Sequence, residues 1–435
     1  MTVRAANRTP TDSTIAYSRN KKLNAAQTNK RKVKYKMKKT ITILLLLCLT
    51  FTMCFSTIAI AEDYENNSSM IMTNNNSLRF SSAIKSNDIL AHATHNLALF
   101  KESLWHISEL FGFTLMEIGH MQLGNPFTIY IFNDSYELAD TNSIVFPLLL
   151  GHDIIGVMEA AYNTLADQWS FTFGKSFGDE LNKLQHQASS NRDFAICRIG
   201  DILFAANGKS TSVIFNEETE ARSNFSEPQM NFLAASVIND KTSFTFVDVK
   251  TPIAGELLDV YALEQSYTLL RVELRQLDVR HVPQGNGICG AAAWAAILNY
   301  RFTSANYTTA TMTKAMTYAG IPMPAAIGKY GDYANNKYNA NCVTQTSPPS
   351  ISNVINWINS NRPVMGGWKR ADGVLHAINI IGYETTQGSN ITYYIVRNPW
   401  DSTPFAQGVI VYGSAPTVAV YVHSGVSWTL AQAVR

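Results

Sequence analysis

Cys289 stands between a glycine-containing turn and a run of strong helix formers. Residues 284–290 read QGNGICG, and residues 291–300 continue as AAAWAAILNY. Glycine permits a tight turn and alanine has the highest helix propensity, so the pattern predicts that Cys289 begins a helix. The unpaired N–H groups and the positive end of the helix dipole favour a thiolate there. A lone cysteine is more commonly a small buried apolar residue, but this position suits a nucleophile.

A thiolate nucleophile needs a base, and residues 276–435 contain three histidines. His281 lies only eight residues before Cys289, too close in sequence to fold back onto it. His423 follows a strand pattern rich in valine and tyrosine, which is typical of a structural histidine. His376 follows an Asp-Gly turn and begins the strand pattern HAINIIGY, and a histidine at the mouth of a strand can face a cleft. His376 is therefore the candidate base.

Asn398 lies 22 residues after His376, at the end of the next strand pattern. This spacing is expected for neighbouring strands of one hairpin. The side-chain carbonyl of Asn398 could then hold the imidazole N–H and set its tautomer, and Trp400 could cover that bond from water. An Asn-Pro turn is the ordinary interpretation of this short sequence taken alone.

The order Cys–His–Asn is what makes these residues informative together. Cys289, His376 and Asn398 are the candidate catalytic residues, with Trp400 in support. The amide of Gln284 and the backbone N–H of Cys289 could form an oxyanion hole. The sequence predicts no metal and no organic cofactor, because it contains no cluster of metal ligands and its glycine-containing turn has no lysine for phosphate. This arrangement would suit acyl transfer.

Together these stretches resemble the staphopain family of bacterial papain-like proteases. The matching segments are residues 284–299, 363–382 and 397–401, within residues 260–435. The resemblance implies an α+β papain-like domain, in which the nucleophile-bearing helix packs on an antiparallel sheet or half-barrel, and an endopeptidase acting on proteins or peptides. A proteinaceous inhibitor is a further partner that it allows. One departure is the loop from Gln284 to Cys289, which is one residue shorter than usual in that family.

Residues 124–184 resemble, more weakly, the cystatin-like propeptide of the same family. The middle of the chain alternates helix and strand patterns, and residues 196–206 and 212–215 flank Asn207-Gly208, a strong hairpin signal. We predict helices at 78–110, 177–184 and 254–270, and strands at 127–132, 144–150, 154–158, 169–173, 196–206 and 212–215. One helix with a meander of strands suggests an antiparallel sheet curled around a helix.

The beginning of the chain has the pattern of a secretory signal peptide. Residues 30–39 contain seven basic residues, residues 41–60 are apolar, and residues 59–61 read AIA, as at a cleavage site. We therefore expect a secreted, extracellular protein with no membrane attachment after cleavage. Residues 1–36 are polar and without hydrophobic periodicity, so we expect either a true start at Met37 or a disordered leader before it. An uncleaved membrane anchor is the alternative, because about 20 apolar residues can span a bilayer.

Composition and charge divide the chain further. Of its 435 residues 46% are hydrophobic and 16% charged, which is typical of a globular protein and excludes general disorder. Residues 62–275 carry 13 basic and 27 acidic residues, whereas residues 276–435 carry 10 and 5. The basic residues of the last part are scattered, so we expect no nucleic-acid partner. We predict a leader and signal at 1–61, an acidic inhibitory propeptide with linker at 62–255, and a catalytic domain at 256–435.

Two other functions stay open on the sequence alone. A Cys–His hydrolase could instead act on exported leader peptides or on cell-wall peptides, although such relatives more often place Asp in the third position. Alternatively, the chain could be a binding protein with a degenerate protease domain. Cys342 lies in a polar loop without a histidine or glutamine motif beside it, so we do not expect it to be a nucleophile.

Overall fold

The computed structural model describes residues 78–255 and 272–435, apart from short gaps at 84–87, 106, 134, 139–142, 164–166, 188–192, 201, 208–210, 217–225, 240–244, 286–287, 372, 387–390, 402–403, 413–418 and 425. The chain divides into two units, Met1–Thr73 and Asn74–Arg435, and every described residue belongs to the second. The predicted signal peptide, the linker at 62–77 and most of the predicted helix 254–270 lie outside the described residues.

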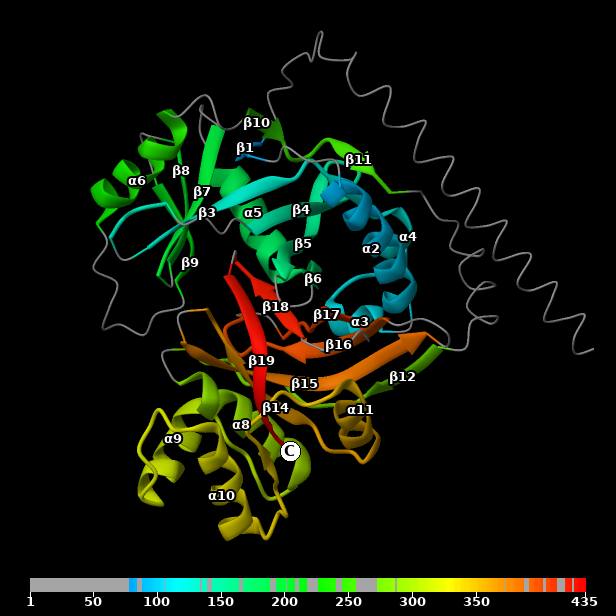
Figure 1. The fold of residues 1–435 in the computed structure, drawn as a ribbon, viewed down its shortest axis with the longest axis vertical. Coiled ribbons are helices and arrows are strands. Elements are labelled where there is room, and N and C mark those ends of the chain that lie inside the picture. Colours follow the sequence, from blue (N-terminus) through cyan, green and yellow to red (C-terminus); the bar gives the residue numbers. More distant parts are fainter. Residues whose placement is uncertain are drawn as a thin grey trace, which may run out of the picture. The chain divides into compact units, whose positions relative to one another are not determined.

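The N-terminal half of the described chain combines strands with a few helices (Figure 1). Its strands are β1 (Arg79–Ser82), β2 (Gln122–Gly124), β3 (Phe127–Phe132), β4 (Ser143–Leu150), β5 (Asp153–Asn163), β6 (Gln168–Gly174), β7 (Asp193–Ile199), β8 (Ile202–Ala206), β9 (Thr211–Asn216), β10 (Thr245–Asp248) and β11 (Pro252–Ala254). Its helices are α2 (Asp88–Leu104), α3 (Ser108–Phe111), α4 (Leu115–His120), α5 (Ser176–Gln187) and α6 (Glu227–Asn239).

Most strands predicted in this half are confirmed, but two predictions are wrong in part. The predicted helix 78–110 begins too early, because Arg79–Ser82 forms strand β1, which pairs with β10. Strand β1 reads RFSS and has a single apolar residue, so it has no helical spacing of its own. The predicted strand 196–206 is two strands, since Gly200 adopts φ +54° in the turn between β7 and β8. The predicted hairpin partner is confirmed, because β8 pairs antiparallel with β9.

The C-terminal half begins with β12 (Val272–Gln276) and then a group of helices. The helices are α8 (Cys289–Arg301), α9 (Thr309–Tyr318), α10 (Ile327–Tyr338) and α11 (Ile351–Asn359). The remaining strands are β13 (Thr344–Gln345), β14 (Val364–Lys369), β15 (Leu375–Thr386), β16 (Ile391–Arg397), β17 (Gln407–Tyr412), β18 (Val420–His423) and β19 (Val426–Val434). The helix predicted to begin at Cys289 is therefore confirmed.

One ladder of strands runs through both halves. In the C-terminal half the antiparallel order is β18, β19, β14, β15, β16, β17. Strand β17 then pairs antiparallel with β6, which continues through β5, β4 and β3. The parallel pair β3–β7 leads on to β8 and β9. The result is a large, mostly antiparallel sheet.

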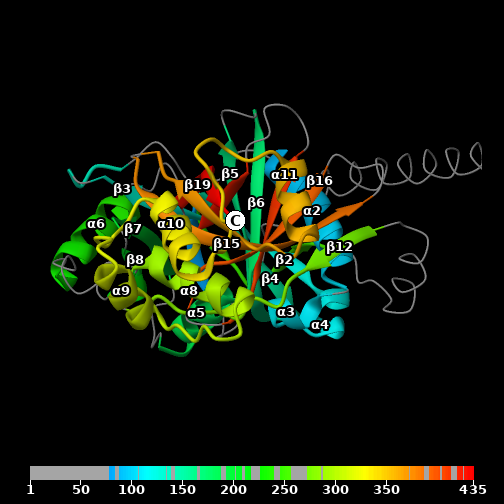
Figure 2. The same ribbon diagram turned by 90° about the horizontal axis from the view of Figure 1, so that it is seen from below.

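The helices of the C-terminal half gather beside β15, as Figures 1 and 2 show for α8, α9 and α10. Helix α8 packs on β15 and β14, and α10 packs on β19. The residues from Ala291 to Leu298 are buried all around the helix, as expected for a helix that is apolar on every face. Small alanine side chains let α8 lie close to the sheet, which positions its first turn.

Contacts between the two halves lie along β6 and its neighbours. Besides the β6–β17 pairing, the backbone N–H of Val422 donates to Thr172 Oγ1 at 2.9 Å. The buried guanidinium of Arg198 donates to the carbonyl of Ser424 at 3.0 Å. These bonds join the N-terminal half to β17 and to the β18–β19 hairpin. Within the described residues, no helix is long and apolar enough to cross a membrane.

Candidate active site

Cys289 is the first residue of α8 and is half-buried. The preceding residue, Ile288, has extended backbone geometry (φ −99°, ψ 125°) and makes no side-chain cap bond. The first N–H groups of α8 therefore have no capping side chain to satisfy them and can face an anion. The next residue, Gly290, leaves no room for a side chain, because a Cβ there would lie 2.2 Å from the hydroxyl of Tyr330 on α10. This close packing fixes the first turn of the helix.

The segment before Cys289 is tied to the loop that follows β16. The backbone N–H of Gln284 donates to the carbonyl of Pro399 at 2.7 Å. His281 Nε2 lies 3.0 Å from the carbonyl of Asp401, two residues further on. From the other side, the hydroxyl of Thr309 donates to the carbonyl of Pro283 at 2.7 Å. These bonds bring the predicted oxyanion residue and the Asn-Pro-Trp sequence together.

His376 and Asn398 meet as the hairpin prediction required. His376 lies near the start of β15 and Asn398 directly follows β16, and the two strands pair antiparallel. His376 Nε2 is 2.8 Å from Asn398 Oδ1, and both side chains are buried. His376 Nδ1 is also buried and has no hydrogen-bond partner among the described residues. The imidazole therefore keeps one nitrogen for a further partner.

The thiol lies next to the strand that carries His376. The backbone N–H of Ala377, the residue after His376, lies close enough to the sulfur of Cys289 to favour the thiolate, as do the N–H groups at the start of α8. Ala377 and Cys289 also belong to the same apolar cluster. The nucleophile candidate and the base candidate thus lie at the same edge, where α8 begins beside β15.

Trp400 covers the imidazole. Its ring stacks on that of His376 with centroids 3.5 Å apart and planes 14° apart. Trp428 on β19 approaches both rings, with its centroid 5.4 Å from His376 and 5.5 Å from Trp400. Two large aromatic rings therefore keep water from the bond between His376 and Asn398, and an electrostatic interaction is stronger where water is excluded.

Burial favours the uncharged forms of both reactive groups. It raises the pKa of the Cys289 thiol, although the three backbone N–H groups act in the opposite direction. Burial lowers the pKa of His376 to about 3, and the bond to Asn398 only partly offsets it. The resting pair in this structure is thus a thiol and a neutral imidazole. A neutral imidazole can accept a proton, as a base must.

Gln284 lies beside the site but its oxyanion role stays a prediction. The residue is 9% exposed, and its Oε1 has no hydrogen-bond partner among the described residues. Gly285 after it adopts φ +53°, which only glycine takes readily.

Two functional candidates escaped the sequence analysis. Asn398 Nδ2 donates to the hydroxyl of Tyr421 on β18 at 2.9 Å, and that hydroxyl donates in turn to Gln407 Oε1 on β17. All three side chains are buried. Their positions in the sequence share no motif with Asn398, so the strand register of the sheet would have been needed to find them.

His423, Cys197 and Cys342 are not part of the candidate pair of nucleophile and base. His423 stacks on Tyr421 with centroids 5.8 Å apart, and burial lowers its pKa to about 3. Cys197 is fully buried in the N-terminal half. Cys342 lies 3.3 Å from a guanidinium nitrogen of Arg301, but burial still raises the pKa of its thiol.

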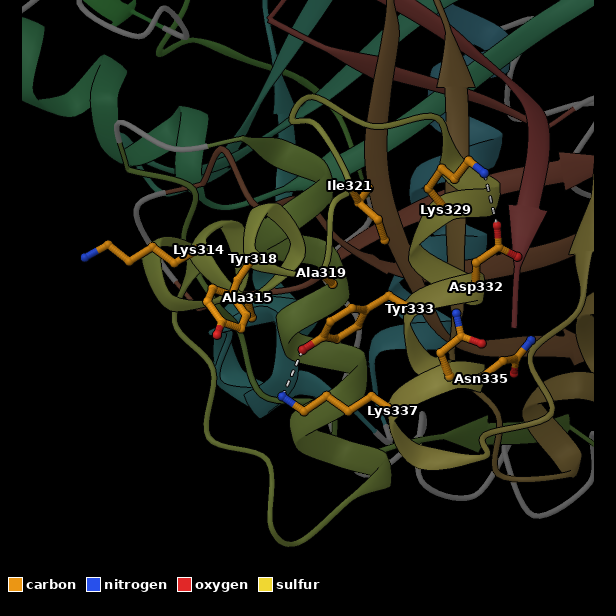
Figure 3. A pocket seen from close by; sticks show the side chains of 11 residues that line it. Lys314, Ala315, Tyr318, Ala319, Ile321, Lys329, Asp332, Tyr333, Asn335 and Lys337 are labelled. Carbon is orange, nitrogen blue, oxygen red and sulfur yellow. Dashed lines mark hydrogen bonds and ion pairs between the residues drawn. The ribbon is translucent and has the colours of Figure 1, made fainter.

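A hollow of the described chain lies elsewhere, between α9 and α10 (Figure 3). It measures about 980 Å³ and is lined in part by Lys314, Lys329 and Lys337. Lys337 donates to the hydroxyl of Tyr333 at 3.0 Å, and Lys329 pairs with a carboxylate in its own helix. Two of the three lysines therefore have partners already. No group of histidine, cysteine, aspartate and glutamate side chains in the described chain is arranged to hold a metal ion.

Comparison with known proteins agrees with the chemistry of this site. No curated protein matches the chain. Residues 276–415 match the model of a family described as Peptidase_C39 like family. The matched segment contains Gln284, Cys289, His376 and Asn398, and the mixed fold with its mostly antiparallel sheet is compatible with a cysteine peptidase. Residues 276–415 are therefore similar to a family of cysteine peptidases, although the match does not single out the staphopain family.

Proposed function

We propose that this chain is the zymogen of a secreted cysteine endopeptidase of the staphopain type. The observation that carries the proposal is the buried 2.8 Å bond between His376 and Asn398, beside a cysteine at a helix N-terminus. Asn398 accepts the Nε2 proton of His376, which leaves the Nδ1 lone pair to take the thiol proton. Cys289, His376 and Asn398 then act as nucleophile, base and orienting residue.

The reaction would proceed as acyl transfer. The sulfur of Cys289 attacks the carbonyl carbon of the peptide bond while its proton passes to His376 Nδ1. The N–H of Cys289 and the amide of Gln284 stabilise the oxyanion. The resulting imidazolium protonates the leaving amine, and the C–N bond breaks to leave a thioester. Water, deprotonated by His376, then hydrolyses the thioester and regenerates the thiol.

The catalytic assignment is tested with the purified chain under reducing conditions and casein as substrate. We expect that Cys289→Ala and His376→Ala abolish cleavage, because each removes one half of the nucleophile–base pair. Asn398→Ala should reduce cleavage less, since this residue orients the base and takes no part in bond making. Unchanged folding is checked by circular dichroism. Cleavage by purified Cys289→Ala would overturn the assignment.

Latency is the second part of the proposal. The segment before the catalytic domain is acidic, and it contacts β17 and the β18–β19 hairpin close to Trp400. Opposite net charges speed and orient such docking, and salt screens them over about 10 Å at 0.1 M. Cleavage is expected between about Val249 and Arg280, and within this range at residues 256–271, because these residues separate the two halves in sequence while the flanking strands β11 and β12 are paired.

Adding residues 62–255 to the processed enzyme tests latency. Inhibition that weakens with salt supports docking with an electrostatic part. Inhibition that does not change with salt keeps the propeptide role but removes the charge argument. An absence of inhibition at micromolar concentration contradicts both.

The family match favours a second candidate, a Cys–His hydrolase that acts on leader peptides or cell-wall peptides. The matched family is one of cysteine peptidases and does not point specifically to the staphopains. Asn398 in the third position is the feature that speaks for the endopeptidase instead. The same preparation is therefore given casein, a double-glycine leader peptide and muropeptides. Cleavage of one of the last two, without cleavage of casein, would select the alternative.

A further inference from the structure

The orienting residue of this site is an amide, and an amide has two different ends. A carboxylate offers two equivalent oxygens, whereas a carboxamide offers one acceptor oxygen and one donor nitrogen. Only the oxygen of Asn398 can accept the Nε2 proton of His376. If the amide rotated by half a turn, its NH₂ would require a lone pair on Nε2, and the ring proton would move to Nδ1, which faces away from Asn398. The base would then be lost.

The oxygen end of Asn398 is held by the main chain. The backbone N–H of Trp400 donates to Asn398 Oδ1 at 3.0 Å, and a backbone N–H can only donate. The same oxygen accepts from His376 at 2.8 Å. Asn398 is 0% exposed, so bulk water does not compete for these bonds.

The nitrogen end is held by a chain of two side chains. Asn398 Nδ2 lies 2.9 Å from the hydroxyl of Tyr421, and this hydroxyl also contacts Gln407 Oε1. The amide oxygen of Gln407 can only accept, so the single proton of Tyr421 points to Gln407. The oxygen of Tyr421 must therefore accept from Asn398. The whole chain of donors then has one direction, from His376 through Asn398 and Tyr421 to Gln407.

The sheet holds the two outer residues in place. Gln407 is 4% exposed and pairs with Val396, two residues before Asn398. Tyr421 is 0% exposed, and its ring packs edge-on against Trp368 with centroids 5.9 Å apart. Neither side chain has room to turn away from the amide, which is what a fixed orientation requires.

We propose that Tyr421 and Gln407 are positioning residues for His376, because through Asn398 they fix which imidazole nitrogen carries the proton. This inference rests on the proposed function in taking His376 as the base of Cys289. It adds that an asparagine in the orienting position needs an acceptor on its nitrogen side, and that the Tyr421–Gln407 pair supplies one.

The test measures alkylation of Cys289 by iodoacetamide in the full chain as a function of pH, with the modified peptide quantified by mass spectrometry. This reaction reports how readily Cys289 gives up its proton and needs no peptide substrate. We expect Tyr421→Phe to slow alkylation at pH 7 by at least about tenfold, since a wrong tautomer is known to be costly. Its pH profile should move toward that of His376→Ala. A profile like that of the wild type would overturn the proposal.

A second background separates positioning from packing. Asn398→Asp replaces the amide by a symmetric carboxylate, which has no orientation to lose. In the Asn398→Asp chain, adding Tyr421→Phe should change the alkylation rate by a much smaller factor than it does in the wild-type chain. An equal factor in both backgrounds would show that Tyr421 acts only through packing, and the proposal would fail.

The controls come from the same sheet. Tyr394→Phe removes another buried tyrosine hydroxyl, from β16, and should leave the alkylation profile unchanged. If Tyr421→Phe does not fold, Gln407→Leu takes its place, because it removes the acceptor that directs the hydroxyl of Tyr421. Gln407→Leu should also move the profile toward that of His376→Ala, and an unchanged profile would again overturn the proposal. Absence of casein cleavage with the alkylation effects intact would contradict the proposed function alone.

Discussion

Gly290 shows how closely single residues constrain the candidate nucleophile. Gly290 directly follows Cys289, and a Cβ at this position would meet the hydroxyl of Tyr330. Tyr330 itself is only 1% exposed. The ring of Tyr330 packs against Trp294 on α8 with centroids 6.3 Å apart. A larger residue at position 290 would therefore displace either a buried ring or the first helical turn.

Gly290→Ala should accordingly impair the site without unfolding the chain. The new Cβ would stand 2.2 Å from the Tyr330 hydroxyl and 2.6 Å from its ring carbon, so the turn that carries Cys289 must shift. A small displacement of a reacting atom can cost about 100-fold in rate, and we expect a loss of roughly that size in casein cleavage. Adding Tyr330→Ala should restore part of the lost rate, because it removes the obstacle.

Gly328→Ala is the matched control for that prediction. Gly328 lies in α10, and a Cβ there would meet only Thr344 at 3.5 Å, an ordinary contact distance. Its activity should equal that of the wild type. If Gly290→Ala were equally active, the packing of Tyr330 would have no bearing on Cys289.

For single residues, the sequence predicts the candidate catalytic residues better than the side chains that hold them in place. Cys289 could be placed at a helix start because glycine and alanine patterns act locally. His376 and Asn398 could be paired because one hairpin joins them. Tyr421 and Gln407 could not be found, since their side chains reach Asn398 only through the register of β17 and β18 in the sheet. Whether these residues carry catalysis stays a prediction.

Among the elements, β15 links the candidate site to the N-terminal half. It carries His376 near its start and Glu384 near its end. Glu384 is 2% exposed and lies beside the hydroxyl of Ser103 in α2, with Glu102 nearby. Burial, together with the charge of Glu102, raises the pKa of Glu384 to about 7, and burial raises the pKa of Glu102 as well. A buried acid is therefore placed where α2 meets β15.

This acid makes stability depend on pH. An unfolded glutamate ionises with a pKa near 4.5, whereas folded Glu384 ionises near 7. Its ionisation therefore begins to oppose folding above pH 4.5, and the full cost, on the order of 3 kcal/mol, is reached above pH 7. Glu384→Gln removes this cost. In a Cys289→Ala chain, which lacks the proposed nucleophile, we expect Glu384→Gln to unfold a few degrees higher at pH 8 and at the same temperature at pH 4.5.

Glu109→Gln in α3 serves as the control for this measurement, because Glu109 is exposed. It should leave the unfolding temperature unchanged at both pH values. Equal unfolding temperatures of the Glu384→Gln and parent chains at pH 8 would contradict the argument.

The elements themselves could be predicted where their pattern is local and strong. The strands Phe127–Phe132 and Gln168–Gly174 have clear apolar patterns between turn residues, and the structure confirms them. The strand Arg79–Ser82 could not be predicted, because its identity depends on pairing with β10, more than 160 positions later in the chain. Tertiary pairing decided this segment, because its four residues include only one apolar residue and have no clear local pattern.

In the whole molecule, one buried cation joins the acidic segment to the candidate site. Arg198 on β7 donates to the carbonyl of Gly200 in its own half and to that of Ser424 in the other, each at 3.0 Å. Ser424 follows His423, whose ring lies 6.4 Å from that of Trp400. Arg198 therefore holds the acidic segment next to the aromatic cover of His376.

Arg198→Ala should weaken latency. A hydrogen bond from a charged group contributes about 2 kcal/mol, and its loss would also leave the Ser424 carbonyl with one donor fewer. We expect the full chain carrying Arg198→Ala to cleave casein after a shorter lag than the wild type. Lys314→Ala, at an exposed lysine on α9, should not change the lag. Equal lags for Arg198→Ala and the wild type would contradict a role of Arg198 in docking.

The most direct test of the central claim identifies the nucleophile itself. The full chain is reduced, cut between its two halves by an added protease, treated with a peptidyl epoxide that reacts with activated thiols, and digested for mass spectrometry. We expect the label on Cys289, its loss in His376→Ala, and both label and casein cleavage unchanged in Cys342→Ser. A label on Cys342 in place of Cys289, or casein cleavage by a Cys289→Ala chain that takes up no label, would contradict Cys289 as the nucleophile.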